Sequence, residues 1–219
     1  MTLKVYYDLM SQPCRALFIF LKANKIPFES CLVALRKGEH LTDDYAKVNP
    51  FQRVPAIDHN GFKLTETIAI LRYLCTQYPV ADHWYPKDVR QRARVDEYTH
   101  WQHTNLRFFG SMLFIGRVMK QKKEPDPRFL GGLEKSLDQL EQVFLSNSQF
   151  INGFSEITIA DLLATCEIQQ PISAGFDLLA NRPTLRDYMK RVRDRTNPFY
   201  DEAHKVSDLV KSRVAEGKL

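Results

Sequence analysis

A serine and a cysteine stand three residues apart near the N-terminus, where a strand is expected to pass into a helix. Residues Leu3–Tyr7 predict the strand, and Pro13 suits the first turn of the helix, because the N–H that proline lacks is not needed there. Ser11 is then expected at the positive end of a helix dipole, where a thiolate would be stabilised. Ser11-x-x-Cys14 also has the spacing of a Cys-x-x-Cys redox motif, with serine in the reactive first position. A dithiol cycle is excluded, so any sulfur handled by this turn must arrive on a ligand.

Three other interpretations of this turn stay open. Ser11 could simply cap the helix, since serine is a favoured N-cap residue. A serine-hydrolase role has little support, because no G-x-S-x-G nucleophile elbow surrounds Ser11. A glutaredoxin-like reductase could use Cys14 alone, but Cys14 falls one turn into the helix, where we expect it to be buried.

The elements that must hold this turn form a first domain, predicted over residues 1–78. Their order, strand–helix–strand–helix–strand–strand–helix, predicts a mixed sheet covered by helices. Asn60-Gly61 lies between the last two strands and is a strong hairpin signal. We expect strands at 3–7, 28–35, 54–58 and 62–64, and helices at 13–24, 42–48 and 66–78.

A change in composition follows, and residues 79–87 predict a linker punctuated by prolines. The remainder, residues 88–219, is helical in pattern, and we expect one long helix from Asp88 to about Met119. Thr158 and Asp161 have the spacing of a capping box, so we expect Asp161 to fix a helix start rather than to do chemistry. A domain rich in strands is thus followed by an all-helical one.

The composition limits the class of protein. The chain has 219 residues, of which 44% are hydrophobic, and no run approaches the ~20 apolar residues that cross a bilayer. The N-terminus carries no secretory signal pattern, so we expect no membrane partner and a cytoplasmic location.

The charged residues and the cysteines set further limits. Four cysteines without paired spacing favour free thiols in a reducing compartment, and the absence of a His/Cys cluster predicts no metal site. The net charge of +5 favours a small anionic ligand. The basic runs at 120–123 and 186–195 lack interleaved aromatic residues, so we expect solvated helix faces and no nucleic-acid partner.

Several stretches together resemble the cytosolic glutathione S-transferases, and the theta class in particular. They are DLMSQPCRA at 8–16, KGEHL at 37–41, VNPFQRVPA at 48–56 and LTETIAILRYL at 64–74, with RVDEY and WQH at 94–103 extending the match. The resemblance implies an α/β thioredoxin-like N-terminal domain (1–78), a linker (79–87) and an all-α C-terminal domain (88–219). It further implies a cytosolic homodimer that uses glutathione as co-substrate and acts on small hydrophobic electrophiles.

The resemblance also implies roles for residues of the first domain. The Ser11 hydroxyl would hydrogen-bond the glutathione sulfur and favour its thiolate form. Glutathione would be bound by His40, Leu41, Arg53, Val54, Pro55, Glu66 and Thr67 of this domain, and by Thr104 of the helical domain. In this set the helix start at Glu66-Thr67 suits the γ-glutamyl carboxylate, and a cis Val54-Pro55 bond would free the Val54 backbone to pair with the cysteinyl unit. A helix cap at Glu66 and an ordinary strand-start proline at Pro55 are the simpler alternatives.

Arg107 is the candidate catalytic residue of the helical domain, because in theta enzymes the matching arginine lies near the sulfur. We expect it in mid-helix beside Thr104, although a solvated arginine is the plain alternative. The electrophile pocket is expected to include Leu9, Met10, Phe108 and Met112, whereas core packing is the ordinary role of such an apolar stripe. The expected reactions are conjugation of halogenated carbons or epoxides and reduction of organic hydroperoxides.

A second class of function also fits the same fold. The chain could be a non-catalytic carrier of apolar ligands, or a protein-interaction module such as the one in translation elongation factor gamma subunits. Ser11, Val54-Pro55 and Glu66-Thr67 occur together, and this favours a working glutathione site.

Overall fold

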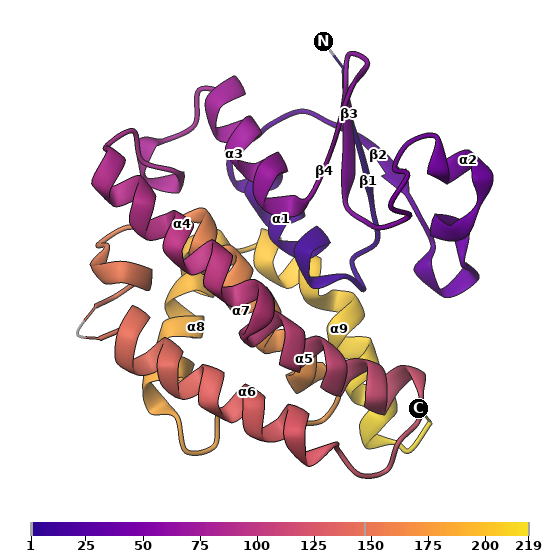
Figure 1. The fold of residues 1–219 in the computed structure, drawn as a ribbon, viewed down its shortest axis with the longest axis vertical. Helices are drawn as coiled ribbons and strands as arrows, with labels where there is room; N and C mark the ends of the chain where they lie inside the picture. Colours follow the sequence, from indigo (N-terminus) through magenta and orange to yellow (C-terminus); the bar gives the residue numbers. More distant parts are fainter. Residues whose placement is uncertain (1, 147, 219) are drawn as a thin grey trace. The chain divides into compact units, whose positions relative to one another are not determined.

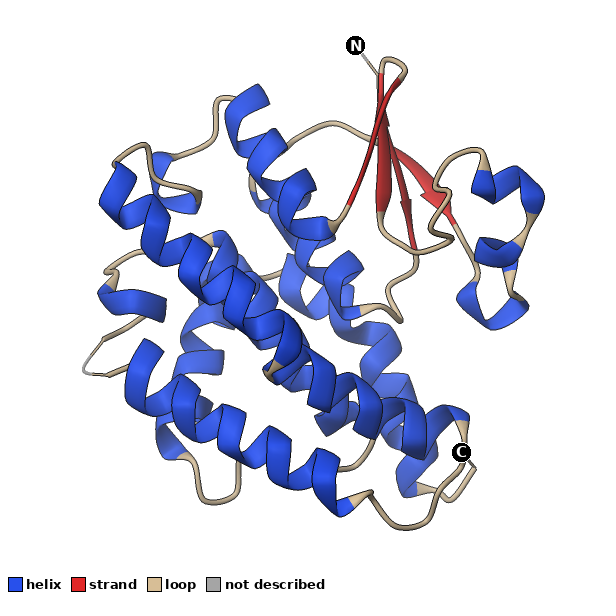
Figure 2. Cartoon of the chain, in the orientation of Figure 1, coloured by secondary structure: helices blue, strands red, loops and turns tan. Residues whose placement is uncertain are grey.

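The computed structural model describes residues 2–146 and 148–218. The chain divides into two compact units, Met1–Ala81 and Asp82–Leu219, and the division falls inside the expected linker. All strands of the described residues belong to the first unit, and the second unit is helical (Figure 1, Figure 2).

The first unit is built on a four-stranded mixed sheet with the strand order β2-β1-β3-β4. Its strands are β1 (Leu3–Tyr7), β2 (Glu29–Leu32), β3 (Ala56–His59) and β4 (Phe62–Thr65). β1 pairs with β2 in parallel, which requires a crossover, and α1 (Gln12–Ala23) supplies it. The β3–β4 hairpin turns at Asn60 and Gly61, both with positive φ as this type of tight turn requires. The predicted mixed sheet is therefore confirmed.

Two helices cover the sheet because their apolar residues need burial. α1 is buried along most of its length, and it packs against α3 (Thr67–Gln77). In Figure 1, α1 and α3 lie side by side on one face of the sheet, and the short α2 (Asp43–Ala46) lies on the other side. The core residues of β1 alternate with half-buried ones, as expected for one face of a strand.

The predicted second strand was too long at its end. We expected it to run to Leu35, but β2 ends at Leu32 and the chain winds into the 3₁₀ turn η1 (Leu35–Lys37). The backbone N–H of Ala34 donates to the Glu39 carboxylate at 2.7 Å, and that of Leu35 donates to Asp8 at 3.0 Å. The Leu35 N–H thus bonds to a side chain instead of continuing the pairing with β1, and the Ala34 N–H is tied to the turn that follows.

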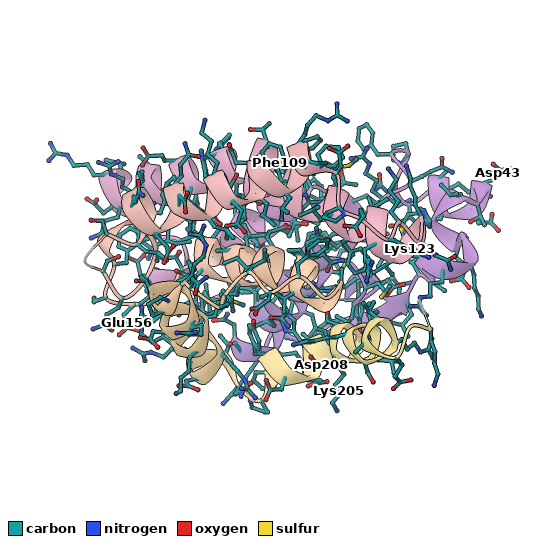
Figure 3. The ribbon with its side chains drawn as sticks, turned by 90° about the horizontal axis from the view of Figure 1, so that it is seen from below. Asp43, Phe109, Lys123, Glu156, Lys205 and Asp208 are labelled. Carbon is teal, nitrogen blue, oxygen red and sulfur yellow. The ribbon has the colours of Figure 1, made fainter. Side chains whose placement is uncertain are left out.

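The second unit is organised around α7 (Ile159–Ser173), whose residues are almost all buried. The other helices are α4 (Val89–Thr104), α5 (Leu106–Phe114), α6 (Pro127–Gln139), α8 (Pro183–Thr196) and α9 (Phe199–Ala215). π-helical turns extend α5 (η4, Ile115–Met119) and α6 (η5, Leu140–Phe144), and 3₁₀ turns lie at η3 (Asp82–Trp84) and η6 (Ile151–Gly153). α9 turns Lys205 and Asp208 to solvent (Figure 3). Within residues 2–146 and 148–218, no helix is long and apolar enough to cross a membrane.

The start of α7 has the predicted capping box. Asp161 accepts from the Thr158 backbone N–H at 2.8 Å, while the Thr158 hydroxyl accepts from the Ala160 N–H at 3.2 Å. The same carboxylate also accepts from the Ile151 N–H at 2.9 Å and from the Tyr188 hydroxyl at 3.0 Å. Asp161 therefore joins three segments of the helical core, and its predicted structural role is confirmed.

The prediction of one long helix from Asp88 to Met119 was wrong. α4 ends at Thr104, and Asn105 leaves helical geometry with φ −113° and ψ −104° before α5 begins. The Asn105 side chain donates to the Trp101 carbonyl at 2.8 Å, in the place of a backbone N–H. Short amide side chains compete with the backbone in this way and interrupt helices.

Candidate active site

Ser11 lies at the junction of β1 and α1, as the sequence predicts. It is the N-cap residue of α1 with φ −83° and ψ 123°, and its N–H donates to the Asp8 carbonyl at 3.0 Å. Among the described residues, however, no N–H of the first turn donates to its hydroxyl. Ser11 therefore occupies the N-cap position, as the simple interpretation expects, but its hydroxyl does not make the capping hydrogen bond.

Cys14 lies one turn into α1 and is only 1% exposed, so its predicted burial is confirmed. Burial raises the pKa of its thiol to about 12, against smaller opposing effects of hydrogen bonds from Ser11 and the Asp8 backbone. The thiol is thus protonated at neutral pH and inaccessible. Both properties argue against a reductase that uses Cys14 as its nucleophile.

The turn before Ser11 is held from two sides. The Asp8 carboxylate accepts from the Met10 N–H at 2.8 Å, and the fully buried Arg15 donates to the carbonyls of Leu9 and Met10 at 2.9 and 3.2 Å. Leu9 and Met10, expected in the electrophile pocket, are half-buried and have fixed backbone positions.

His40 lies in the 3₁₀ turn η2 (Glu39–Leu41) that follows β2 and η1. Gly38 joins the two turns with φ +72°, a conformation that favours glycine. The buried Nδ1 atom of His40 has no hydrogen-bond partner among the described residues, and Leu41 is 62% exposed. The imidazole nitrogen is therefore not committed to the fold.

The Val54-Pro55 peptide bond is cis, as expected. The preceding carbonyl, that of Arg53, accepts from the Tyr45 hydroxyl and from the Asn49 side chain, each at 2.7 Å. Sequence reasoning missed these two residues, since Asn49-Pro50 was interpreted only as the end of a helix. The side chain of Arg53 is exposed, and its backbone is fixed by neighbours on both sides.

Glu66 and Thr67 stand where β4 passes into α3. Glu66 has φ +66°, a strained region for a non-glycine residue, and such strain tends to occur at functional sites. Glu66 is the N-cap residue of α3, but within the part of the chain that the structure describes its side chain makes no capping hydrogen bond. The first N–H groups of α3 can therefore receive an anion, beside the buried Thr67.

The pairing register places Ser11, His40, Val54-Pro55 and Glu66-Thr67 next to strand ends that lie at the same end of the sheet. Tyr6 of β1 pairs with Ala56 at the start of β3, and Ala56 pairs with Thr65 at the end of β4. Tyr7 pairs with Leu32 at the end of β2. At this end, β1 leads to Ser11, β2 leads to the turns that carry His40, β4 leads to the start of α3, and the Val54-Pro55 bond leads into β3. The turn after β1, the segment before β3, the start of α3 and the turns after β2 thus lie at the same end of the sheet (Figure 2).

Arg107 belongs to the second unit, and its expected position in mid-helix was wrong. It lies in the first turn of α5, while Thr104 is the last residue of α4 on the other side of the break at Asn105. Arg107 pairs with the Glu167 carboxylate of α7 at 3.4 Å. The Arg107 side chain is 30% exposed and that of Glu167 is 1% exposed, so a buried anion anchors a partly accessible cation.

The apolar candidates on α5 form part of an aromatic cluster. Phe108 is 46% exposed and makes edge-on contacts with Phe109 and Phe129, with ring centroids 5.2 and 6.0 Å apart. Phe109 packs against Gly132 of α6, where a methyl group would collide with the ring. Met112 is half-buried and helps to line a small cavity together with Phe129. Phe108 thus presents apolar surface to solvent, whereas Phe109 packs within the unit.

The described residues contain no group of three His, Cys, Asp or Glu side chains that could hold a metal ion. All four cysteines are free thiols; Cys14 and Cys166 are buried, and Cys31 and Cys75 are half-buried.

Known proteins of one family resemble this chain in both sequence and structure. The family model of the glutathione S-transferase N-terminal domain matches residues 1–76. Glutathione S-transferase theta-1 of Homo sapiens is 44% identical over 214 residues, covering 94% of this chain and 89% of the human protein. The apo structure of human glutathione S-transferase T1-1 superposes with a TM-score of 0.89 at 40% identity, covering 99% of this chain and 98% of that chain.

A human theta-class glutathione transferase in complex with the glutathione conjugate of 1-menaphthyl sulfate has a TM-score of 0.91 at 35% identity, covering 100% of this chain and 92% of that chain. The chain therefore belongs to the glutathione S-transferase family. Its identity to the theta enzymes over nearly its whole length assigns it to the theta class, as a transferase that uses glutathione. The thioredoxin-like first domain and the all-helical second domain implied by the resemblance are likewise confirmed.

Proposed function

We propose that this chain activates the thiol of glutathione through the Ser11 hydroxyl and transfers the thiolate to small electrophiles. The observation that carries this proposal is the position of the hydroxyl. The hydroxyl lies at the N-terminus of α1 and makes no capping hydrogen bond. At the same end of the sheet lie the start of α3, the Val54 backbone and the turn of His40, which suit a peptide with two carboxylates.

Glutathione would bind across this end of the sheet. The N–H groups at the start of α3, with Glu66 and Thr67, would receive the γ-glutamyl carboxylate and amine. The backbone of Val54, turned by the cis bond to Pro55, would pair with the cysteinyl unit like an added strand. His40 and Arg53 would bind the glycyl carboxylate by charge-assisted hydrogen bonds, next to Leu41.

The Ser11 hydroxyl would then donate a hydrogen bond to the glutathione sulfur. A free thiol has a pKa near ~8.5, so only a small fraction is ionised at neutral pH. The hydrogen bond and the dipole of α1 both favour the thiolate, and each unit of lowered pKa corresponds to ~1.4 kcal/mol. With an alkyl halide, the sulfur would form a bond to carbon while the halide leaves with its electron pair. With a hydroperoxide, the sulfur would attack one oxygen and an alkoxide would leave.

The second unit would contribute residues that bind the electrophile and stabilise the thiolate. Arg107, held by Glu167 and partly accessible, would favour the thiolate as a cation, with Thr104 contributing to the glutathione site. The residues that we propose for binding the electrophile are Leu9, Met10, Phe108 and Met112. The theta-class complex with a conjugate of 1-menaphthyl sulfate supports activated alkyl carbons as electrophiles. A cytosolic homodimer belongs to the same proposal, and analytical ultracentrifugation would test the dimer.

The experiment that tests this proposal compares the parent with Ser11→Ala. We expect kcat to fall by about 10–100-fold at pH 7, because a hydrogen bond to a charged group contributes ~1.5–3 kcal/mol. The affinity for immobilised glutathione should change little, and the apparent thiol pKa in the pH–rate profile should rise. An unchanged pKa and kcat would remove Ser11 from the mechanism. Binding to glutathione without turnover of any halogenated substrate by the parent would favour the carrier function.

A further inference from the structure

The two loops that bear Ser11 and His40 are joined by one carboxylate, that of Asp8. Its Oδ1 atom accepts from the Met10 N–H at 2.8 Å, inside the turn that leads to Ser11. Its Oδ2 atom accepts from the Leu35 N–H at 3.0 Å, in the first residue of η1 and just before the turn that carries His40. Its backbone carbonyl receives the Ser11 N–H at 3.0 Å.

A carboxylate is suited to this bridging position. Aspartate offers two acceptor oxygens that point in different directions, and hydrogen bonds to a charged acceptor are stronger than neutral ones. An asparagine of the same shape has one acceptor oxygen, so it could satisfy only one of the two N–H groups. The neutral variant must therefore release either the turn before Ser11 or the turn before His40.

The opposite side of the Ser11 turn is held independently. Arg15, buried in α1, donates to the carbonyls of Leu9 and Met10 at 2.9 and 3.2 Å. Arg15 thus fixes the carbonyl side of the turn and Asp8 fixes its N–H side. The Asp8 carboxylate also reaches the segment after β2, through the Leu35 N–H.

We infer that Asp8 is a positioning residue that couples the thiol-activating turn to the glycyl-carboxylate turn of the glutathione site. This inference rests on the proposed function, since it assigns Asp8 an effect through Ser11 and His40. Asp8 touches neither sulfur nor electrophile in this scheme. It sets the distance between two ends of the bound tripeptide, and through it the placement of the sulfur against the Ser11 hydroxyl.

The test is a double-mutant cycle of Asp8→Asn with Ser11→Ala, read by kcat, the glutathione KM and the apparent thiol pKa. We expect Asp8→Asn alone to lower kcat about tenfold, to raise KM and to raise the thiol pKa, because a misplacement near 1 Å can cost up to ~10²-fold in rate. In the Ser11→Ala background, the effect of Asp8→Asn on kcat and thiol pKa should disappear, while the effect on KM should remain.

Asp58→Asn is the matched control. The Asp58 carboxylate also accepts a turn N–H, that of Gly61 at 2.7 Å, but at the hairpin on the opposite end of the sheet. It should lower stability without moving the thiol pKa. If Asp8→Asn does not fold, Leu35→Pro cuts only the link to η1, because proline lacks the N–H and Ala34 already has φ −71° and ψ 94°, compatible with a following proline. That variant should raise KM, and it should raise the thiol pKa less than Asp8→Asn does, because the turn before Ser11 keeps its own hydrogen bond to Asp8.

The outcomes separate the inference from the proposed function. If Ser11→Ala keeps the parent's kcat and thiol pKa, the proposed function fails and the inference falls with it. If Ser11→Ala lowers kcat but Asp8→Asn reduces kcat by the same factor in both backgrounds, only the inference is overturned. The inference also fails if Asp8→Asn and Asp58→Asn behave alike, or if Leu35→Pro leaves KM at the parental value.

Discussion

Two polar groups of the first helical turn have opposite environments. The Ser11 hydroxyl is half-buried at the helix start, whereas the Cys14 thiol is almost fully buried one turn later. The two side chains share a hydrogen bond, yet burial dominates the cysteine and raises the pKa of its thiol to about 12. The chain's own sulfur at this turn is therefore neutral and buried, whereas the proposed mechanism uses the sulfur of a ligand.

This environment predicts that Cys14 resists alkylation. With a pKa of about 12, only about 10⁻⁴ of the Cys14 thiols are ionised at pH 8, and access is blocked as well. Mass spectrometry of the native protein treated with iodoacetamide at pH 8 should find Cys14 unmodified while the half-buried Cys31 is labelled. Rapid labelling of Cys14 with loss of turnover would restore the reductase interpretation.

At the scale of elements, α5 carries residues proposed for chemistry and is fixed by close packing on its neighbours. Arg107 pairs with Glu167 of α7, and Phe109 packs on Gly132 of α6. The position of Phe108 depends on this packing, because Phe108 contacts both Phe109 and Phe129. Small residues of α6 therefore help to determine which apolar surface α5 presents.

Gly132→Ala is expected to destabilise the protein by about 1–3 kcal/mol, since the added methyl group would overlap the half-buried Phe109 ring and force it to move. Gly131→Ala is the matched control. A methyl group at Gly131 would meet no atom of the described residues within 4 Å, so this variant should be neutral or stabilised by up to ~1 kcal/mol, as alanine favours helices. Urea denaturation of the two variants measures the difference, and equal stabilities would contradict the packing argument.

The start of α7 predicts a dependence of stability on pH. Burial raises the pKa of Asp161 to about 6 despite its hydrogen bonds, whereas the unfolded value is ~3.9. The folded protein therefore binds more protons than the unfolded chain between these values, so the free energy of unfolding contributed by this group falls as pH rises from about 4 to 6.

The parent should lose on the order of 2–3 kcal/mol over that interval relative to Asp161→Asn, which lacks the titrating group. Denaturant unfolding of both proteins at pH 4 and pH 7 measures this difference. Asp208→Asn, at an exposed position of α9, should follow the parent. A parent that gains stability over the interval would show that the hydrogen bonds outweigh burial.

Local signals were sufficient for much of the fold and for part of the candidate site. The turn at Ser11, the Asn60-Gly61 hairpin and the capping box at Thr158 were predicted because each depends on residues a few positions apart. The early end of β2 was missed because the Leu35 N–H donates to Asp8, a residue distant in sequence, which is a tertiary effect. The break at Asn105 was missed because its amide competes with the backbone.

The support of the candidate site was the least predictable part. Tyr45 and Asn49 hold the Arg53 carbonyl, and Glu167 holds Arg107 from 60 residues away. No periodicity or motif marks such partners, because they act through the fold rather than through their neighbours in sequence.

At the scale of the whole molecule, the net charge of +5 and a sequence pI of about 9.0 favour an anionic co-substrate. Glutathione carries two carboxylates and one amine, so its net charge is negative. We expect the glutathione KM to rise by a few fold between 10 mM and 200 mM NaCl, because ions screen charges beyond ~10 Å at 0.1 M. Steady-state kinetics at constant pH measures this, and kcat serves as the internal control. A KM independent of salt would contradict the electrostatic argument.

The amide groups at the first turn of α3 and beside the Val54-Pro55 bond are parts of the main chain. Amino-acid replacement changes a side chain and leaves such atoms in place. A mutational library over the exposed positions of α5 could therefore be screened for new electrophiles without redesigning the pocket for the tripeptide. In the proposed mechanism, a family of such enzymes could therefore change the electrophiles that it accepts while keeping glutathione as the thiol donor.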